Sequence, residues 1–132
     1  MTTASNAPAD TPFYLLGGEP TMRAIVERFY DLMDADPAYA ELRAMHAPDL
    51  GMMRASLTGF LTGWAGGPRD WFEQNPGKCM MSAHRAFAIT PAVSAQWAEA
   101  MQRAIADVAP ANAALGKQMA DTLTQMAQRM AR

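Results

Sequence analysis

The sequence predicts an all-helical protein with one domain. Apolar residues recur every three or four positions in each of its long segments, which is the pattern of amphipathic helices. No segment alternates between apolar and polar residues as a strand does, and glycines and prolines separate the segments. A chain of 132 residues, half of them hydrophobic, is long enough for one compact core and too short for two.

The first part of the chain predicts a tail, a short helical turn and a long helix. Residues 1–12 lack the basic leading region and the apolar block of a secretory signal, so we interpret them as a disordered tail before a domain over residues 13–132. Residues 13–16 can form about one helical turn before a glycine pair. The apolar stripe that follows predicts a helix from about Pro20 to Asp34.

The middle of the chain predicts two helices and a loop. After a break at Asp36-Pro37, residues 38–44 form a short helical stretch, and a second amphipathic stripe runs from Leu50 to Trp64. Residues 66–80 hold glycines, prolines and an asparagine without a helical period. The sequence therefore predicts a loop there, and loops of such length in compact domains usually serve a function.

The last part of the chain predicts two further long helices, from Val93 to Val108 and from Leu115 to Met130, divided by Pro110. No apolar run approaches the roughly twenty residues that a membrane-spanning helix needs, so we expect no membrane partner and a cytoplasmic protein. The formal charge is −2 and the basic residues are scattered, which excludes the basic stripe of a nucleic-acid-binding protein.

Few residues offer chemistry. The single cysteine cannot form an internal disulfide or a zinc cluster, and motifs for phosphate loops, nucleophile elbows and paired-histidine zinc sites are absent. Acidic residues gather near the end of the first long helix, at Asp31, Asp34 and Asp36. This cluster is more typical of a solvated surface than of a metal site.

His84 follows the predicted loop and has apolar neighbours on both sides. A neutral imidazole in such surroundings suits iron ligation, although local sequence alone favours a half-buried histidine bonded to the backbone. Tyr30, His46 and Trp97 each join a hydrogen-bond donor to an apolar body beside an amphipathic stripe, which suits either a ligand site or an ordinary core. The twelve methionines fit a cofactor cavity and a plain helical core equally well.

Several short motifs, taken together and in order, resemble those of the second group of truncated haemoglobins. The resemblance runs from Phe13 to Met130, and the thirteen residues from His84 to Trp97 add to its specificity. The matching pieces are Phe13-Tyr14 followed by Gly17-Gly18, Arg28-Phe29-Tyr30, residues 64–69, residues 84–89 and Trp97.

The resemblance implies a two-over-two helical sandwich that encloses haem b, with His84 as the iron ligand. Tyr30, Trp97 and His46 match the polar positions on the distal side, and His46 falls where the family has tyrosine, phenylalanine or histidine. Met53 matches the place of the distal histidine in ordinary globins. The other expected contacts of the ring or its distal face are Leu57, Phe60, Leu61, Trp71, Met80, Met81 and Phe87.

One departure from the family concerns the haem propionates. Members often have an arginine directly before the iron-ligating histidine, where this chain has Ala83. Lys78 and Arg85 are the alternative candidates for this contact. The departure bears on the propionates and leaves the expected iron ligand unchanged.

The resemblance also implies a function: binding of oxygen, nitric oxide, carbon monoxide or peroxide at a five-coordinate iron. Each distal donor to bound oxygen is worth about 1.5–3 kcal/mol, so two donors slow oxygen release by about a hundredfold or more. Tight binding suits redox chemistry, namely nitric oxide dioxygenase or peroxidase-like activity with an unidentified reductant, better than oxygen transport. The alternatives are an oxygen-binding or gas-sensing globin without turnover, and a haem-free helical interaction domain.

Overall fold

The computed structural model describes residues 10–77, 84 and 87–131, and it confirms the all-helical fold. Over these ranges the regular structure is helical throughout, without strands. The helices are α1 (Pro12–Leu16), α2 (Gly18–Ala35), the 3₁₀ helix η1 (Pro37–Tyr39), α3 (Ala40–Ala44), α4 (Gly51–Trp64), α5 (Asp70–Gln74), α7 (Pro91–Val108) and α8 (Ala113–Met130).

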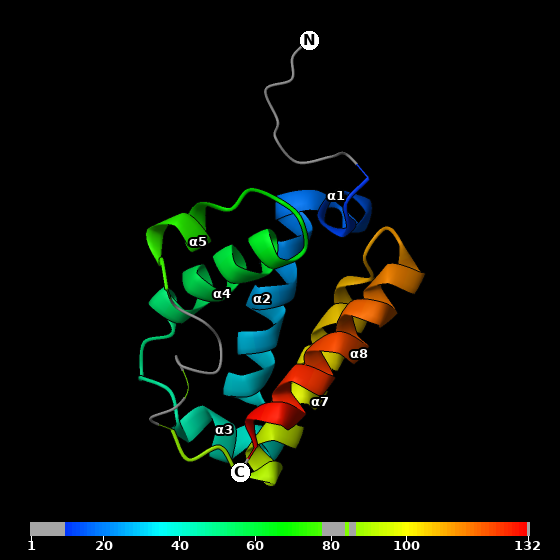
Figure 1. The fold of residues 1–132 in the computed structure, drawn as a ribbon. Helices are drawn as coiled ribbons and strands as arrows, with labels where there is room; N and C mark the ends of the chain where they lie inside the picture. The colour runs from blue at the N-terminus through cyan, green and yellow to red at the C-terminus, as the bar shows by residue number, and fades with distance from the viewer. Residues whose placement is uncertain (1–9, 78–83, 85–86, 132) are drawn as a thin grey trace.

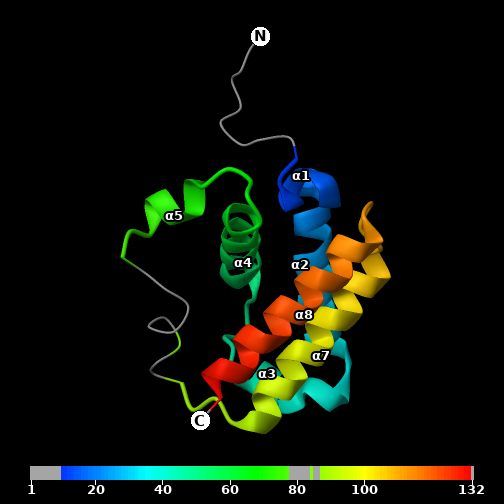
Figure 2. The same cartoon turned by 45° about the vertical axis from the view of Figure 1, so that its right-hand side comes forward.

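Helix α2 is the central element of the molecule. It packs against α7 on one side and against α4 on the other, while α7 pairs with α8 (Figure 1). In the second view, α2 with α4 and α7 with α8 form the two helix pairs of a two-over-two sandwich (Figure 2). The short helix α5 packs on α4, and α1 packs on the beginning of α2 and on α8.

The hydrophobic core follows the predicted apolar stripes. Helix α2 buries a side chain at every third or fourth position, α7 packs its own stripe against α2, and α8 packs its stripe mainly against α7. Full burial of one large apolar side chain stabilises a fold by about 1.5–3 kcal/mol, so these stripes supply most of the packing energy. The buried residues of α2 are Met22, Ile25, Val26, Phe29, Tyr30, Leu32 and Met33.

The first long helix begins earlier and ends later than predicted, at Gly18 and Ala35 rather than at Pro20 and Asp34. Gly17 and Gly18 have φ angles of 130° and 76°, which glycine adopts without strain, so the chain turns from α1 directly into α2. Helix α2 stops because Asp36 is extended before Pro37. Helix α1 itself begins at Pro12, inside the predicted tail, whose first nine residues lie outside the described ranges.

The two C-terminal helices agree with the prediction to within two residues at each end. Side chains cap both of them: Thr90 Oγ1 accepts the Val93 N–H at 3.1 Å, and Asn112 Oδ1 accepts the Leu115 N–H at 3.0 Å.

Within the described ranges, no helix is long and apolar enough to span a bilayer.

The prediction of a loop over residues 66–80 was wrong in part, because residues 70–74 form helix α5. Five residues are too short to display a helical period. Packing holds this helix instead: α4 presents two glycines to it, and a Cβ on Gly63 would lie 2.6 Å from the ring of Phe72, and one on Gly59 2.9 Å from the Cβ of Trp71. Residues 78–80 of the predicted loop lie outside the described ranges.

Replacement of Gly63 by alanine is expected to destabilise the protein by about 1–3 kcal/mol, because the added methyl group overpacks the contact between α4 and α5. Gly116→Ala in α8 is the matched control. Its Cβ would meet neighbours at an ordinary 3.4 Å, so only the gain in helix propensity remains, and stability is expected to hold or rise. Urea unfolding of both variants measures the difference, and equal stabilities would contradict the close approach of α5.

Candidate functional site

Tyr30 lies on α2 in the interior, with only 2% of its surface exposed. Its ring makes edge contacts with Phe29, at 4.9 Å between centroids, and with His46, at 6.1 Å. Burial raises the pKa of Tyr30 to about 12, against a smaller lowering effect of Arg54. No acceptor in the described part of the chain receives a hydrogen bond from the hydroxyl. Tyr30 is therefore a protonated donor that the surrounding protein leaves available.

His46 follows α3 and is half-buried. Its Nδ1 lies 2.9 Å from the carbonyl oxygen of Leu42. A carbonyl oxygen only accepts, so Nδ1 carries the proton and Nε2 of the neutral ring has the lone pair. Burial lowers the pKa of His46, and Arg43 and His84 lower it further, while the bond to Leu42 acts in the opposite direction. His46 thus offers an acceptor to the site at neutral pH, where the sequence predicted a donor.

Trp97 lies on α7 and is half-buried. Its indole ring packs at 63° against Phe29, with 5.3 Å between ring centroids. The indole N–H donates to no acceptor over the ranges that the structure describes. Phe29 therefore contacts both Tyr30 and Trp97 at the interface between α2 and α7. These two residues carry the donors that have no acceptor among the described residues.

His84 is half-buried and lies beside Phe87. The two ring centroids are 6.3 Å apart, and the carbonyl of His84 accepts the backbone N–H of Phe87 at 3.0 Å. His84 is also close enough to His46 to lower its pKa by electrostatic repulsion between the protonated rings. The two imidazoles, which come from separate parts of the chain, thus belong to one region. Met80 and Met81 lie outside the described residues.

The other predicted contacts divide into two sets. Met53 and Leu57 lie one turn apart on α4, and Met53 keeps 39% of its surface exposed, as Phe87 keeps 44%. Phe60 and Leu61 are core residues.

Trp71 anchors α5 to α4. Its indole N–H donates to the hydroxyl of Ser56 at 3.0 Å, and its ring lies 5.6 Å from that of Phe60. Because this N–H is already bonded, Trp71 contributes its ring face and no donor. Trp71 therefore supports α4, the helix that carries several of the predicted site residues.

This set of side chains fits a flat, apolar macrocycle with one axial base. The Tyr30 O–H and the Trp97 N–H have no protein acceptor among the described residues, and neither atom is a fully buried unpaired group, so both can reach a polar ligand. The exposed apolar surfaces of Met53 and Phe87 are ones that a large apolar group would cover. Haem iron commonly takes an imidazole as axial ligand, and His84 is a half-buried imidazole in this region.

The acidic residues at the end of α2 anchor arginines. In the described ranges, no three potential ligand side chains gather as they would around a metal ion. Each carboxylate instead pairs with a different arginine: Asp31 with Arg54 at 3.0 Å, Asp34 with Arg43 at 2.6 Å, and Asp36 with Arg103 at 2.7 Å.

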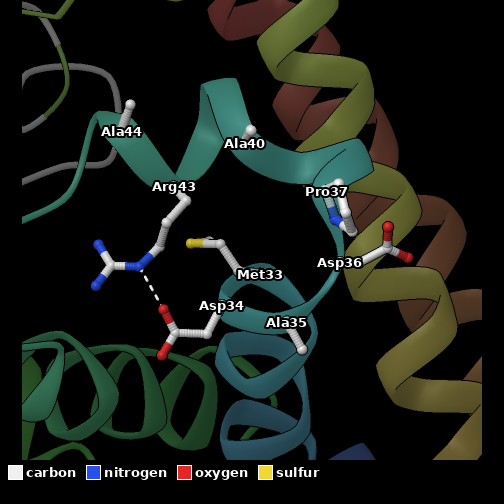
Figure 3. Close-up of a pocket in the computed structure, with 8 residues that line it drawn as sticks. All are labelled: Met33, Asp34, Ala35, Asp36, Pro37, Ala40, Arg43 and Ala44. Atoms are coloured by element: carbon white, nitrogen blue, oxygen red, sulfur yellow. Dashed lines mark hydrogen bonds and ion pairs between the residues drawn. The ribbon is translucent and has the colours of Figure 1, made fainter.

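Arg43 fixes the segment that carries His46. Besides its pair with Asp34, it donates to the carbonyls of Ala47 and Pro48 at 3.0 Å and 2.8 Å. Figure 3 shows the Arg43–Asp34 pair at an open pocket between the end of α2 and α3. None of the predicted site residues lines this pocket. Arg43 and Arg54 carry no sequence signal for these contacts, because neither shares a motif with its partners.

Comparisons with known proteins agree with the fold. A family model described as bacterial-like globin matches residues 11–132. No curated protein sequence gives a significant match.

Three solved structures resemble this chain in both sequence and fold. The cold-adapted truncated hemoglobin of the Antarctic marine bacterium Pseudoalteromonas haloplanktis TAC125 is 30% identical, with a TM-score of 0.88 over 93% of this chain and 98% of that chain. The group II 2-on-2 hemoglobin of the plant pathogen Agrobacterium tumefaciens is 31% identical, with a TM-score of 0.88 over 98% of both chains. The group II truncated hemoglobin of Bacillus anthracis is 26% identical, with a TM-score of 0.83 over 93% of this chain and 97% of that chain.

Proposed function

Because the chain belongs to the bacterial-like globins, and among them to the group II truncated haemoglobins, we propose that it holds oxygen tightly for redox chemistry rather than for delivery. Membership of this family supports binding of small ligands through haem. Haem b as the haem type and the cytoplasm as the location belong to the proposal. The observation that carries it is the pair of donors without a protein acceptor among the described residues, Tyr30 and Trp97, which pack on the same buried ring of Phe29.

Bound haem would supply an iron that takes small ligands and exchanges electrons. In our proposal His84 holds it as the axial ligand, and Met53, Leu57 and Phe87 cover its apolar surface, together with Met80 and Met81 of the sequence prediction. The protein residues then act on the ligand. The Tyr30 O–H and the Trp97 N–H donate hydrogen bonds to the partly negative atoms of the bound ligand. His46 Nε2 accepts a proton from a protonated ligand such as peroxide.

Two detoxification reactions suit these residues. In the first, nitric oxide and oxygen combine to form nitrate with one electron from a reductant, and the two donors favour it by retaining oxygen until nitric oxide arrives. In the second, hydrogen peroxide takes two electrons and two protons to give two waters. The Nε2 lone pair of His46 favours this second reaction, because a neutral base can remove the peroxide proton.

Replacement of His84 by alanine is expected to abolish axial ligation. Haem-reconstituted wild-type protein should give ferric, ferrous and carbon monoxide spectra of a histidine-ligated haem, and the variant should lose them or bind haem weakly. Added imidazole should restore the spectra in part. A wild-type protein that takes up no haem would support the haem-free alternative, and an unchanged variant spectrum would exclude His84 as the ligand.

Removal of the indole donor is expected to speed oxygen release. Trp97→Phe should raise the oxygen dissociation rate by about tenfold or more, since one charge-assisted hydrogen bond contributes about 1.5–3 kcal/mol. Trp64→Phe, a tryptophan at the end of α4, is the matched control and should leave the rate unchanged. Stopped-flow measurements with an oxygen scavenger give both rates. An equal rate in Trp97→Phe and wild type would remove Trp97 from the site.

His46→Phe is expected to slow peroxide reduction by about a hundredfold, the usual contribution of a positioned base, and to leave oxygen release nearly unchanged. The wild-type advantage should be full at neutral pH and shrink on acidification, because protonation removes the Nε2 lone pair. The lowered pKa of His46 places this loss below its ordinary range. Donor oxidation at several pH values measures it, and a rate independent of residue 46 would favour the nitrate reaction.

A further inference from the structure

We propose that Arg54 is a positioning residue for the distal tyrosine: it lies over the ring of Tyr30, is held there by two carboxylates of α2, and strengthens the phenol as a hydrogen-bond donor. The inference rests on the proposed function, because the strength of this donor matters only when Tyr30 bonds a ligand. It adds to that function a residue outside the predicted site.

The position of Arg54 is over-determined. Its guanidinium carbon is 5.7 Å from the centroid of the Tyr30 ring, within the range of a cation–π contact. The terminal nitrogen Nη2 donates to the Asp31 carboxylate at 3.0 Å. The terminal nitrogen Nη1 donates to the Glu27 carboxylate and, at 3.2 Å, to the Glu27 carbonyl. With both terminal nitrogens bonded and only 24% of the side chain exposed, the guanidinium has little freedom to leave the ring.

The spacing along α2 explains why the arginine meets this ring. Glu27, Tyr30 and Asp31 occupy positions i, i+3 and i+4 and therefore lie on one face of the helix. A cation that bridges the first and third of these residues must lie beside the second. On α4, Arg54 directly follows Met53, so the same ion pairs fix the helix that carries the apolar contacts of the site.

A fixed cation beside a phenol strengthens its O–H as a donor, because it stabilises the negative charge that the oxygen gains on donation. Consistent with this, Arg54 lowers the pKa of Tyr30 against the larger effect of burial. The other titratable groups around the ring are the carboxylates of Glu27 and Asp31, both bonded to Arg54, and His46, which is neutral at neutral pH. Arg54 is thus the persistent cation at this ring.

The test compares Arg54→Met with two other variants in the haem-reconstituted protein. Arg54→Met should speed oxygen release by about two- to fivefold, the fold-change expected for loss of one such contact. Arg54→Lys keeps the charge without the two-armed bridge and should recover part of the effect. Arg28→Met is the matched control, since Arg28 pairs with Asp107 at 2.8 Å on the other side of α2 and should leave release unchanged.

A spectroscopic readout separates donor strength from general loosening of the fold. The carbon monoxide stretching frequency falls when a donor approaches the ligand, so Arg54→Met should move it toward the value of Tyr30→Phe, and Arg28→Met should not. If Arg54→Met fails to fold, the shift in Arg54→Lys decides, because that variant should lie between wild type and Tyr30→Phe.

A double-mutant cycle shows whether Arg54 acts through the phenol. In a Tyr30→Phe background, Arg54→Met should have no further effect on oxygen release. An equal effect in both backgrounds would overturn the proposal. If Tyr30→Phe speeds release and Arg54→Met does not, only the inference on Arg54 fails, whereas an unchanged rate in Tyr30→Phe removes the tyrosine from the proposed function itself.

Discussion

The edge contact between Phe29 and Trp97 is the interaction on which the site depends. Phe29 is fully buried, and its ring fixes the position of α7 against α2 at the point where both helices carry a polar aromatic residue. Because Tyr30 follows Phe29 in the chain and packs against it, one apolar ring sets the distance between the two donors. The packed core, and not a loop, therefore determines where the Tyr30 and Trp97 donors lie.

The ion pairs at the outer face of α2 also fix the positions of groups near the candidate site. Exposed ion pairs contribute little stability, so their importance here is geometric. Arg54 pairs with Asp31 and lies over the ring of Tyr30. Arg43 pairs with Asp34 and bonds the carbonyls of Ala47 and Pro48, directly after His46. Two acidic residues of α2 thus hold arginines beside Tyr30 and beside the segment that carries His46.

The sequence predicts the parts of this fold that have a period. The long helices follow from their apolar stripes, whereas the roles of His84, Tyr30 and Trp97 have no period behind them and stay predictions from the family resemblance. Helix α5 could not be predicted, since its stability comes from two glycines of α4 that let Trp71 and Phe72 approach. The arginine contacts could not be predicted either, because Arg54 and Glu27 are 27 residues apart and no local pattern links them.

The polarity of His46 shows how a single backbone contact can change a chemical role. The same imidazole could donate or accept at the site, and the carbonyl of Leu42, one helical turn earlier, decides between them by accepting the Nδ1–H hydrogen bond. The candidate site thus combines two donors and one acceptor, whereas three donors would suit only the proposed retention of oxygen. An acceptor among donors is useful when a ligand must lose a proton, and this asymmetry supports the proposed peroxide reaction beside the proposed retention of oxygen.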